Sequence, residues 1–130
     1  MLENHVDLTV LSTLRDVMET EYPALLHIFI RDSEARVTDL NGLIQAPDFS
    51  PASPTQLQQL GMMAHSFKGS SSNMGAAHLA ELCRQLEDLV RGQTCVSGAL
   101  VTQLVAAIDA EFRVVRDMFE VELDTTLTSD

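Results

Sequence analysis

The chain has 130 residues, a length typical of one compact domain. Hydrophobic residues make up 45% of it and charged residues 21%, which is enough apolar material for a packed core and argues against a disordered chain. Its 8 basic and 19 acidic side chains give a formal net charge of −11 at pH 7. Because such a charge repels nucleic acid and anionic lipid, we expect neither as a partner.

The sequence offers no signal for a membrane, a secretory route or a metal. It has no run of 18 apolar residues and no basic segment at its start, so we expect a cytoplasmic protein. The two cysteines, Cys83 and Cys95, lack the Cys-x-x-Cys spacing of zinc sites, and no histidine follows a glutamate by three positions as in di-metal bundles. We therefore expect that this chain itself holds no metal and no cofactor.

Apolar residues recur at spacings of three and four, which predicts helices throughout. A short first helix is expected from Asp7, a suitable N-cap, to about Glu19. A second helix is expected from Pro23 to about Ala46. Residues 47–54 contain three of the four prolines, which is typical of a linker.

Three further helices are expected after this linker. The first two run from about Pro54 to Met74 and from about Ala76 to Arg91. The last follows a loop that contains Gly98, and its apolar positions reach Phe119. One-sided apolar stripes on long helices joined by short loops indicate an all-α fold, an antiparallel four-helix bundle with the short N-terminal helix packed across it. We expect residues 1–121 to form this single domain and residues 122–130 to form a flexible polar tail.

The third predicted helix contains an exposed histidine in an open setting. At 100° per residue, His65 lies roughly 130° from the centre of the apolar face, which is formed by Leu57, Leu60, Ala64 and Phe67. Its neighbours one turn away on either side are Gly61 and Gly69, and two interior glycines cost a helix about 2 kcal/mol relative to alanine. Lys68, three residues on, favours a negatively charged group near the ring. These residues suggest a site where a large anionic group reaches the imidazole, although a surface histidine in a loosened helix would fit them equally well.

A longer motif favours a functional role for His65 over that of an ordinary surface histidine. The run AHSFKGSSSNMGA over residues 64–76, continued by LAELCRQLE over residues 79–87, resembles the signature of histidine-containing phosphotransfer (HPt) domains. The resemblance implies that His65 accepts a phosphoryl group on its outer ring nitrogen, with Lys68 and Gly69 as its electrostatic and steric partners. Gly61, Ser72 and Glu87 are assigned supporting positions. Many HPt domains carry glutamine where this chain has Glu87, and a carboxylate there would also repel the phosphoryl group.

The resemblance also implies a function and a set of partners. We expect a stoichiometric phosphocarrier, not an enzyme, that accepts a phosphoryl group from a receiver-domain aspartyl phosphate and passes it to the aspartate of another response regulator. The expected partners are the receiver domains of hybrid histidine kinases and response regulators, with Mg²⁺ held by the receiver. The alternative is a non-transferring interaction module that binds and inhibits a kinase or receiver domain, with His65 incidental.

Docking of a receiver domain requires an apolar patch near the histidine. The candidates are one methionine on the His65 helix and three residues of the first helix: Met62, Leu11, Leu14 and Met18. No second broad apolar stripe remains for self-association, so we expect a monomer.

Overall fold

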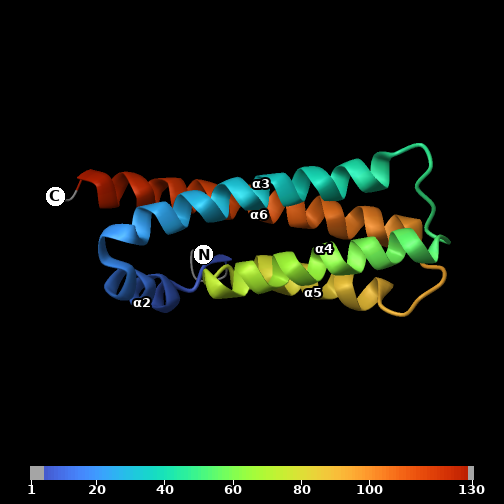
Figure 1. The fold of residues 1–130 in the computed structure, drawn as a ribbon, viewed down its shortest axis with the longest axis horizontal. Helices are drawn as coiled ribbons and strands as arrows, with labels where there is room; N and C mark the ends of the chain where they lie inside the picture. The colour runs from blue at the N-terminus through green and yellow to red at the C-terminus, as the bar shows by residue number, and fades with distance from the viewer. Residues whose placement is uncertain (1–4, 129–130) are drawn as a thin grey trace.

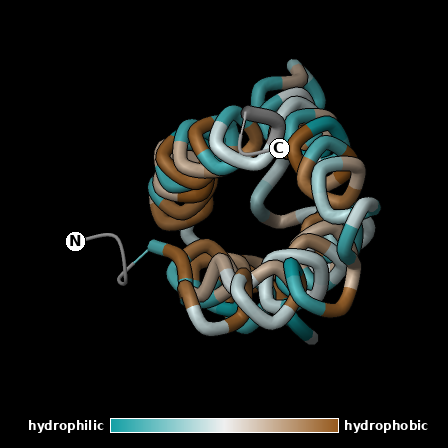
Figure 2. The backbone as a smooth tube through the Cα atoms, turned by 90° about the vertical axis from the view of Figure 1, so that its left-hand side faces the viewer, coloured by the Kyte–Doolittle hydropathy of each residue, from teal (hydrophilic) through white to brown (hydrophobic). Residues whose placement is uncertain are grey.

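A computed structural model describes residues 5–128, and within them the chain is helical with no strand. The elements are α2 (Leu8–Met18), the 3₁₀ turn η1 (Glu19–Glu21), α3 (Tyr22–Gln45), α4 (Pro54–Asn73), α5 (Ala77–Val90) and α6 (Gly98–Thr128). The four long helices form an antiparallel bundle in which α3 and α6 make one row and α4 and α5 the other (Figure 1). Seen along their length, they surround a common centre (Figure 2). The predicted fold class is confirmed.

Local chemistry explains where the helices begin and end. The Asp7 side chain accepts a hydrogen bond from the backbone N–H of Thr9 and caps α2, and Ser53 caps α4 just before Pro54. Gly75 forms the turn between α4 and α5 with φ +76°. A Cβ atom at Gly75 would lie 2.9 Å from the Cβ of Val10, so both its conformation and its contact with α2 require glycine.

The core lies between the two rows of helices. The predicted inward face of α4 is completely buried, with Leu57, Leu60, Ala64 and Phe67 all inaccessible to solvent. From the other row, Phe29 of α3 packs its ring against that of Phe119 of α6, with centroids 5.4 Å apart. These side chains belong to one buried cluster that includes residues of all four long helices. Because the inward side of α4 lies in this cluster, the opposite side of α4 faces outward.

The segment that leads into α2 is fastened to the end of the bundle. Val6 is fully buried, and the Asp7 N–H donates a 2.7 Å hydrogen bond to the Gly75 carbonyl. Nδ1 of His5 lies 2.7 Å from Oε2 of Glu111, a buried carboxylate of α6. These contacts hold α2 across the end of the bundle, as the sequence predicted.

The predicted end of the helical domain at residue 121 is wrong. α6 continues to Thr128, and residues 129–130 lie outside the described part of the chain. The Tyr22 hydroxyl donates a 2.7 Å hydrogen bond to Glu122, which also pairs with Arg15, and burial raises the pKa of Tyr22 well above its usual range. Leu123 is only 5% exposed. This stretch looks polar in sequence, but it is tied to α2 and α3 through a carboxylate and one apolar side chain.

Candidate functional site

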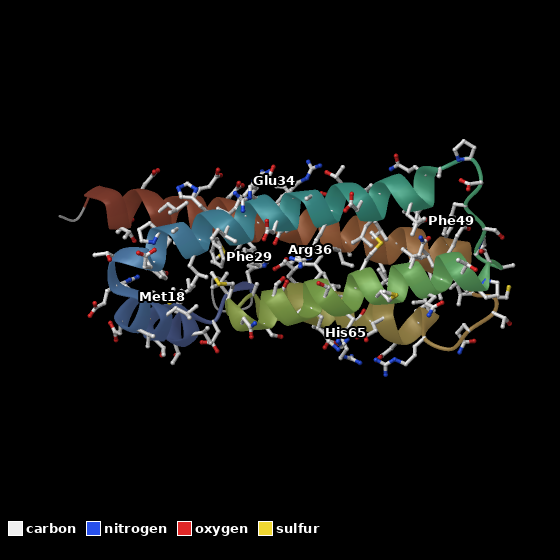
Figure 3. All side chains as sticks on the ribbon, in the orientation of Figure 1. Met18, Phe29, Glu34, Arg36, Phe49 and His65 are labelled. Carbon is white, nitrogen blue, oxygen red and sulfur yellow. The ribbon has the colours of Figure 1, made fainter. Side chains whose placement is uncertain are left out.

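His65 projects from the outer face of α4, on the side turned away from α3 (Figure 3). Its side chain is 68% exposed, as the helical geometry predicted. The residue is fixed because Ala64 and Phe67, its neighbours on the helix, are completely buried. The backbone beneath the imidazole is therefore anchored while the ring itself is open to a partner.

A carboxylate from α5 organises the site. Glu87 is almost completely buried, and its Oε2 atom lies 2.8 Å from Nδ1 of His65. Its other oxygen, Oε1, accepts a 2.7 Å hydrogen bond from Nζ of Lys68. The Lys68 hydrogen bond, supported by those from Arg91 and His65, lowers the pKa of Glu87 to about 2. Glu87 is therefore an anion throughout the physiological range.

The Glu87 contact determines which nitrogen of His65 is free. An ionised carboxylate can only accept hydrogen bonds, so in the neutral imidazole the hydrogen must sit on Nδ1. The lone pair then lies on Nε2, at the exposed edge of the ring. This arrangement presents Nε2 as a nucleophile, with its ring held by a buried partner.

Arg91 is a functional candidate that the sequence reasoning missed. Its Nη2 atom lies 2.8 Å from Oε2 of Glu87, the same oxygen that contacts His65. With a neutral His65, the cluster holds two cations and one anion, so a carboxylate at position 87 does not make the site negative. The spacing of Glu87 and Arg91, one helical turn apart, was the available signal. The repulsion expected from Glu87 is thus offset by Lys68 and Arg91 together.

The two glycines beside His65 have different surroundings. A Cβ atom at Gly69 would meet nothing within 4 Å, which agrees with an uncrowded approach to the imidazole. At Gly61 a Cβ atom would lie 3.3 Å from Cγ2 of Val90, a tight contact. The absence of a side chain at Gly61 therefore serves the close packing of α4 on α5, in addition to leaving room near the ring.

An apolar groove of about 660 Å³ runs beside His65. Its walls include Leu57, Gly61 and Val90, and the polar groups of His65, Glu87 and Arg91 lie along it. Met62, a candidate from the sequence for docking a receiver domain, lines this groove, and 66% of it is exposed. The site thus combines a nucleophilic ring with an apolar recess.

The other docking candidates fare differently. Leu11 is 6% exposed and belongs to the core, so its predicted role in docking is wrong; the inward face of α2 was mistaken for its outer one. Leu14 and Met18 are partly buried against the core. The large apolar side chains that α2 does expose are Leu8 and Val17.

Ser72 lies outside the groove. It lines a smaller hollow with Lys68 and Gly75, and its backbone carbonyl accepts a hydrogen bond from the Gly75 N–H. Within residues 5–128, no group of three or more histidine, cysteine or acidic side chains is placed to hold a metal ion. None of the helices described has the length and apolar character needed to cross a membrane.

Comparison with known proteins identifies the family. The family model described as Hpt domain matches residues 24–127. The chain belongs to the Hpt family. A crystal structure of histidine-containing phosphotransfer protein B (HptB) from Pseudomonas aeruginosa PAO1 is 42% identical, covering 92% of this chain and 95% of that one with a TM-score of 0.77. Hpt domains are the phosphocarriers of two-component phosphorelays and work with histidine kinases and receiver domains.

A second structure supports the fold alone. A rice structure assigned to the histidine-containing phosphotransfer proteins superposes with a TM-score of 0.75 at 19% identity, covering 92% of this chain and 79% of that one. No curated protein matches the chain. The Hpt assignment therefore rests on the family model and on the likeness to HptB.

Proposed function

We propose that this protein is a phosphorelay intermediate that carries a phosphoryl group on Nε2 of His65. The observation that carries the proposal is the 2.8 Å contact between Nδ1 of His65 and the buried Glu87 carboxylate. In the neutral imidazole this contact places the lone pair on Nε2, in a side chain that is largely exposed. Similarity to a histidine-containing phosphotransfer protein over nearly the whole chain supports it. The protein acts in the cytoplasm as a stoichiometric carrier and as a monomer.

The transfer step follows from the geometry of the ring. The Nε2 lone pair attacks the phosphorus of a receiver aspartyl phosphate in line, and the bond from phosphorus to the carboxylate oxygen breaks. The electron pair of that bond leaves on the receiver's aspartate, while the hydrogen on Nδ1 stays against Glu87. In the onward step a second receiver's aspartate attacks phosphorus, the N–P bond breaks, and its electron pair returns to Nε2.

The remaining site residues serve this step by charge and access. Lys68 and Arg91 each donate a hydrogen bond to Glu87. The Lys68 ammonium and the Arg91 guanidinium have further N–H groups that can bind phosphoryl oxygens. Gly69 leaves the approach to the ring open. In this proposal Mg²⁺ is bound by the receiver's acidic site and not by a residue of this chain.

Docking uses the groove beside His65. Met62 is the apolar residue most exposed there, and a methionine adapts to more than one partner surface. The partly buried Leu14 and Met18 remain predictions for docking, and Ser72 remains a prediction for a supporting residue. A relay carrier must accept two receivers in turn, and the open groove suits that requirement.

The proposal is tested by a two-receiver relay. A phosphorylated donor receiver is mixed with the protein and an unphosphorylated acceptor receiver, in Mg²⁺, and the acceptor is followed with time. The phosphoryl group should reach the acceptor receiver in the presence of the wild-type protein and not in the presence of His65→Gln. If both variants bind the donor receiver equally well and neither passes phosphate to the acceptor, the protein is a steric inhibitor instead of a carrier.

A further inference from the structure

Met62 is the most exposed methionine in the part of the chain that the structure describes. Its exposed fraction is 66%, whereas that of Met74 is 4%. The three other methionines of residues 5–128 are partly buried against the core: Met18, Met63 and Met118. Because an oxidant must reach the sulfur atom of a thioether, exposure decides which methionine reacts first. The fold therefore singles out Met62 for oxidation.

Met62 lines two hollows on the surface of the bundle. One is the groove beside His65. The other has a volume of about 630 Å³ and lies between α3 and α4, where Gly42 and Met63 are among the residues that line it. A small molecule can thus reach the Met62 side chain from either hollow.

Oxidation at this position would change the surface next to His65. Met62 precedes His65 by three residues on α4, a spacing at which Cβ atoms of a helix lie about 5–6 Å apart. Oxidation converts the flexible apolar thioether into a polar sulfoxide. A partner that packs apolar groups on Met62 would then have to bury the sulfoxide oxygen, which is unfavourable unless a hydrogen-bond donor replaces the lost water.

The two cysteines can be separated from this effect. Cys83 is completely buried, and burial raises the pKa of its thiol to about 12, so the reactive thiolate is not formed near neutral pH. Cys95 is exposed, but it lies in the loop after α5 and is not among the residues that line the groove. A Cys95→Ser background therefore leaves Met62 as the exposed sulfur of residues 5–128.

We propose that Met62 is a site of reversible oxidation to methionine sulfoxide, which slows phosphoryl exchange with receiver domains and leaves His65 itself reactive. The inference rests on the proposed function, and the oxidant is a peroxide. The Met62 sulfur lone pair attacks one oxygen of hydrogen peroxide, the O–O bond breaks, and hydroxide leaves. Hydroxide takes the proton of the new S–OH group, so the products are the sulfoxide and water. A sulfoxide reductase and two thiols reverse the change and yield methionine, a disulfide and water.

The selectivity of oxidation is measured without a partner. The protein is treated with hydrogen peroxide for increasing times, and peptide masses report a gain of about 16 Da, one oxygen atom, at each methionine. We expect Met62 to react at least about fivefold faster than Met63, its neighbour on α4. In concentrated urea the two rates should become equal, because unfolding exposes both sulfur atoms. Equal rates in the folded protein would overturn the proposal.

The effect on phosphoryl exchange is measured in the Cys95→Ser background and in the same background with Met62→Leu, since leucine is similar in size but lacks sulfur. Each protein is assayed before and after peroxide treatment. Transfer from phospho-His65 to a receiver domain should fall about tenfold in the background protein and less than about twofold in Met62→Leu. Reaction of His65 with phosphoramidate, a small phosphoryl donor, should change by less than about twofold in both. A sulfoxide reductase with a dithiol should restore transfer.

Two results would refute the proposed role of Met62. An equal loss of transfer in Met62→Leu would show that another residue is responsible. A matching loss of reaction with phosphoramidate would show that oxidation acts on His65 or on the fold. If the untreated protein exchanges no phosphoryl group at all, the proposed function is wrong, and the oxidation rates still decide whether Met62 is the modified residue.

Discussion

Nδ1 of His65 and Nη2 of Arg91 bind the same atom, Oε2 of Glu87, each at a distance of 2.8 Å. The imidazole and the guanidinium are therefore held side by side by one buried oxygen, and Lys68 holds the other oxygen of that carboxylate. A single residue of α5 thus sets the tautomer of the histidine and the position of both cations next to it. The properties of the site should depend on Glu87 more than on any other supporting residue.

Removing the Glu87 carboxylate should change the tautomer of His65 and slow its phosphorylation. In Glu87→Ala, His65 loses the partner that keeps hydrogen on Nδ1, so we expect both tautomers to be populated and reaction with phosphoramidate to slow about tenfold. In that reaction Nε2 attacks phosphorus and ammonia leaves. Imidazole ¹⁵N shifts report the tautomer and ³¹P spectra report the rate. Asp88→Ala, next to Glu87 on α5 but paired with Arg84, is the control and should leave both unchanged.

The hydrogen bonds of Glu87 also predict how stability depends on pH. Its pKa is about 2 in the folded protein, below the ordinary value near 4.3 of an unfolded chain. A depressed pKa means that the stabilisation is fully present above about pH 5 and is lost as pH falls toward 2. The difference in unfolding free energy between the wild type and Glu87→Gln, measured by urea denaturation, should therefore shrink over this range. A difference that stays constant from pH 6 to about pH 2 would contradict the assigned pKa.

The sequence predicts those parts of the site that lie on one helix. His65, Lys68 and Gly69 are related by helical periodicity alone, so their common face and the exposure of the ring could be derived directly. The contact of Glu87 with the imidazole depends on how α5 packs beside α4, which no spacing within one helix reveals. The role of Arg91 follows from that same packing, so it was missed although its spacing from Glu87 is regular.

The errors in the fold have similar causes. Leu11 was placed on an exposed surface because the sequence gives the apolar face of α2 without showing which side of the bundle covers it. The end of α6 was set too early because Glu122 reads as a solvent-exposed residue. Its partners, Tyr22 and Arg15, lie about a hundred positions away in the sequence. Long-range polar contacts of this kind leave no periodic signal.

The end of α6 should contribute measurably to stability. A chain that stops at Val121 loses the acceptor of Tyr22 and the buried Leu123 side chain. Burial of a leucine is worth about 1.5–3 kcal/mol and a hydrogen bond to a charged group a similar amount, so we expect a loss of about 3 kcal/mol in urea denaturation. A chain that stops at Thr128 is the control and should match the full chain. If the shorter chain were equally stable, residues 122–128 would be the flexible tail that the sequence suggested.

A buried hydroxyl in α3 should be dispensable. Ser33 is completely buried, and its Oγ has no hydrogen-bond partner among residues 5–128. An unsatisfied buried hydroxyl is destabilising, so we expect Ser33→Ala to raise the unfolding free energy by about 1 kcal/mol. Ser12→Ala, on the exposed side of α2, measures the gain from helix propensity alone and should give about half as much or less. A loss of stability in Ser33→Ala would mean that the hydroxyl has a partner.

The central claim is that His65 is the residue that carries phosphate, and intact mass tests it most directly. The wild type and His65→Gln are each mixed with phosphorylated receiver domains and Mg²⁺, and their masses are recorded before and after mild acid and mild alkali. The account predicts a gain of about 80 Da, one phosphoryl group, on the wild type alone, labile in acid and stable in alkali. The same gain on His65→Gln, or no gain on a folded wild type that still binds the receiver, would contradict it.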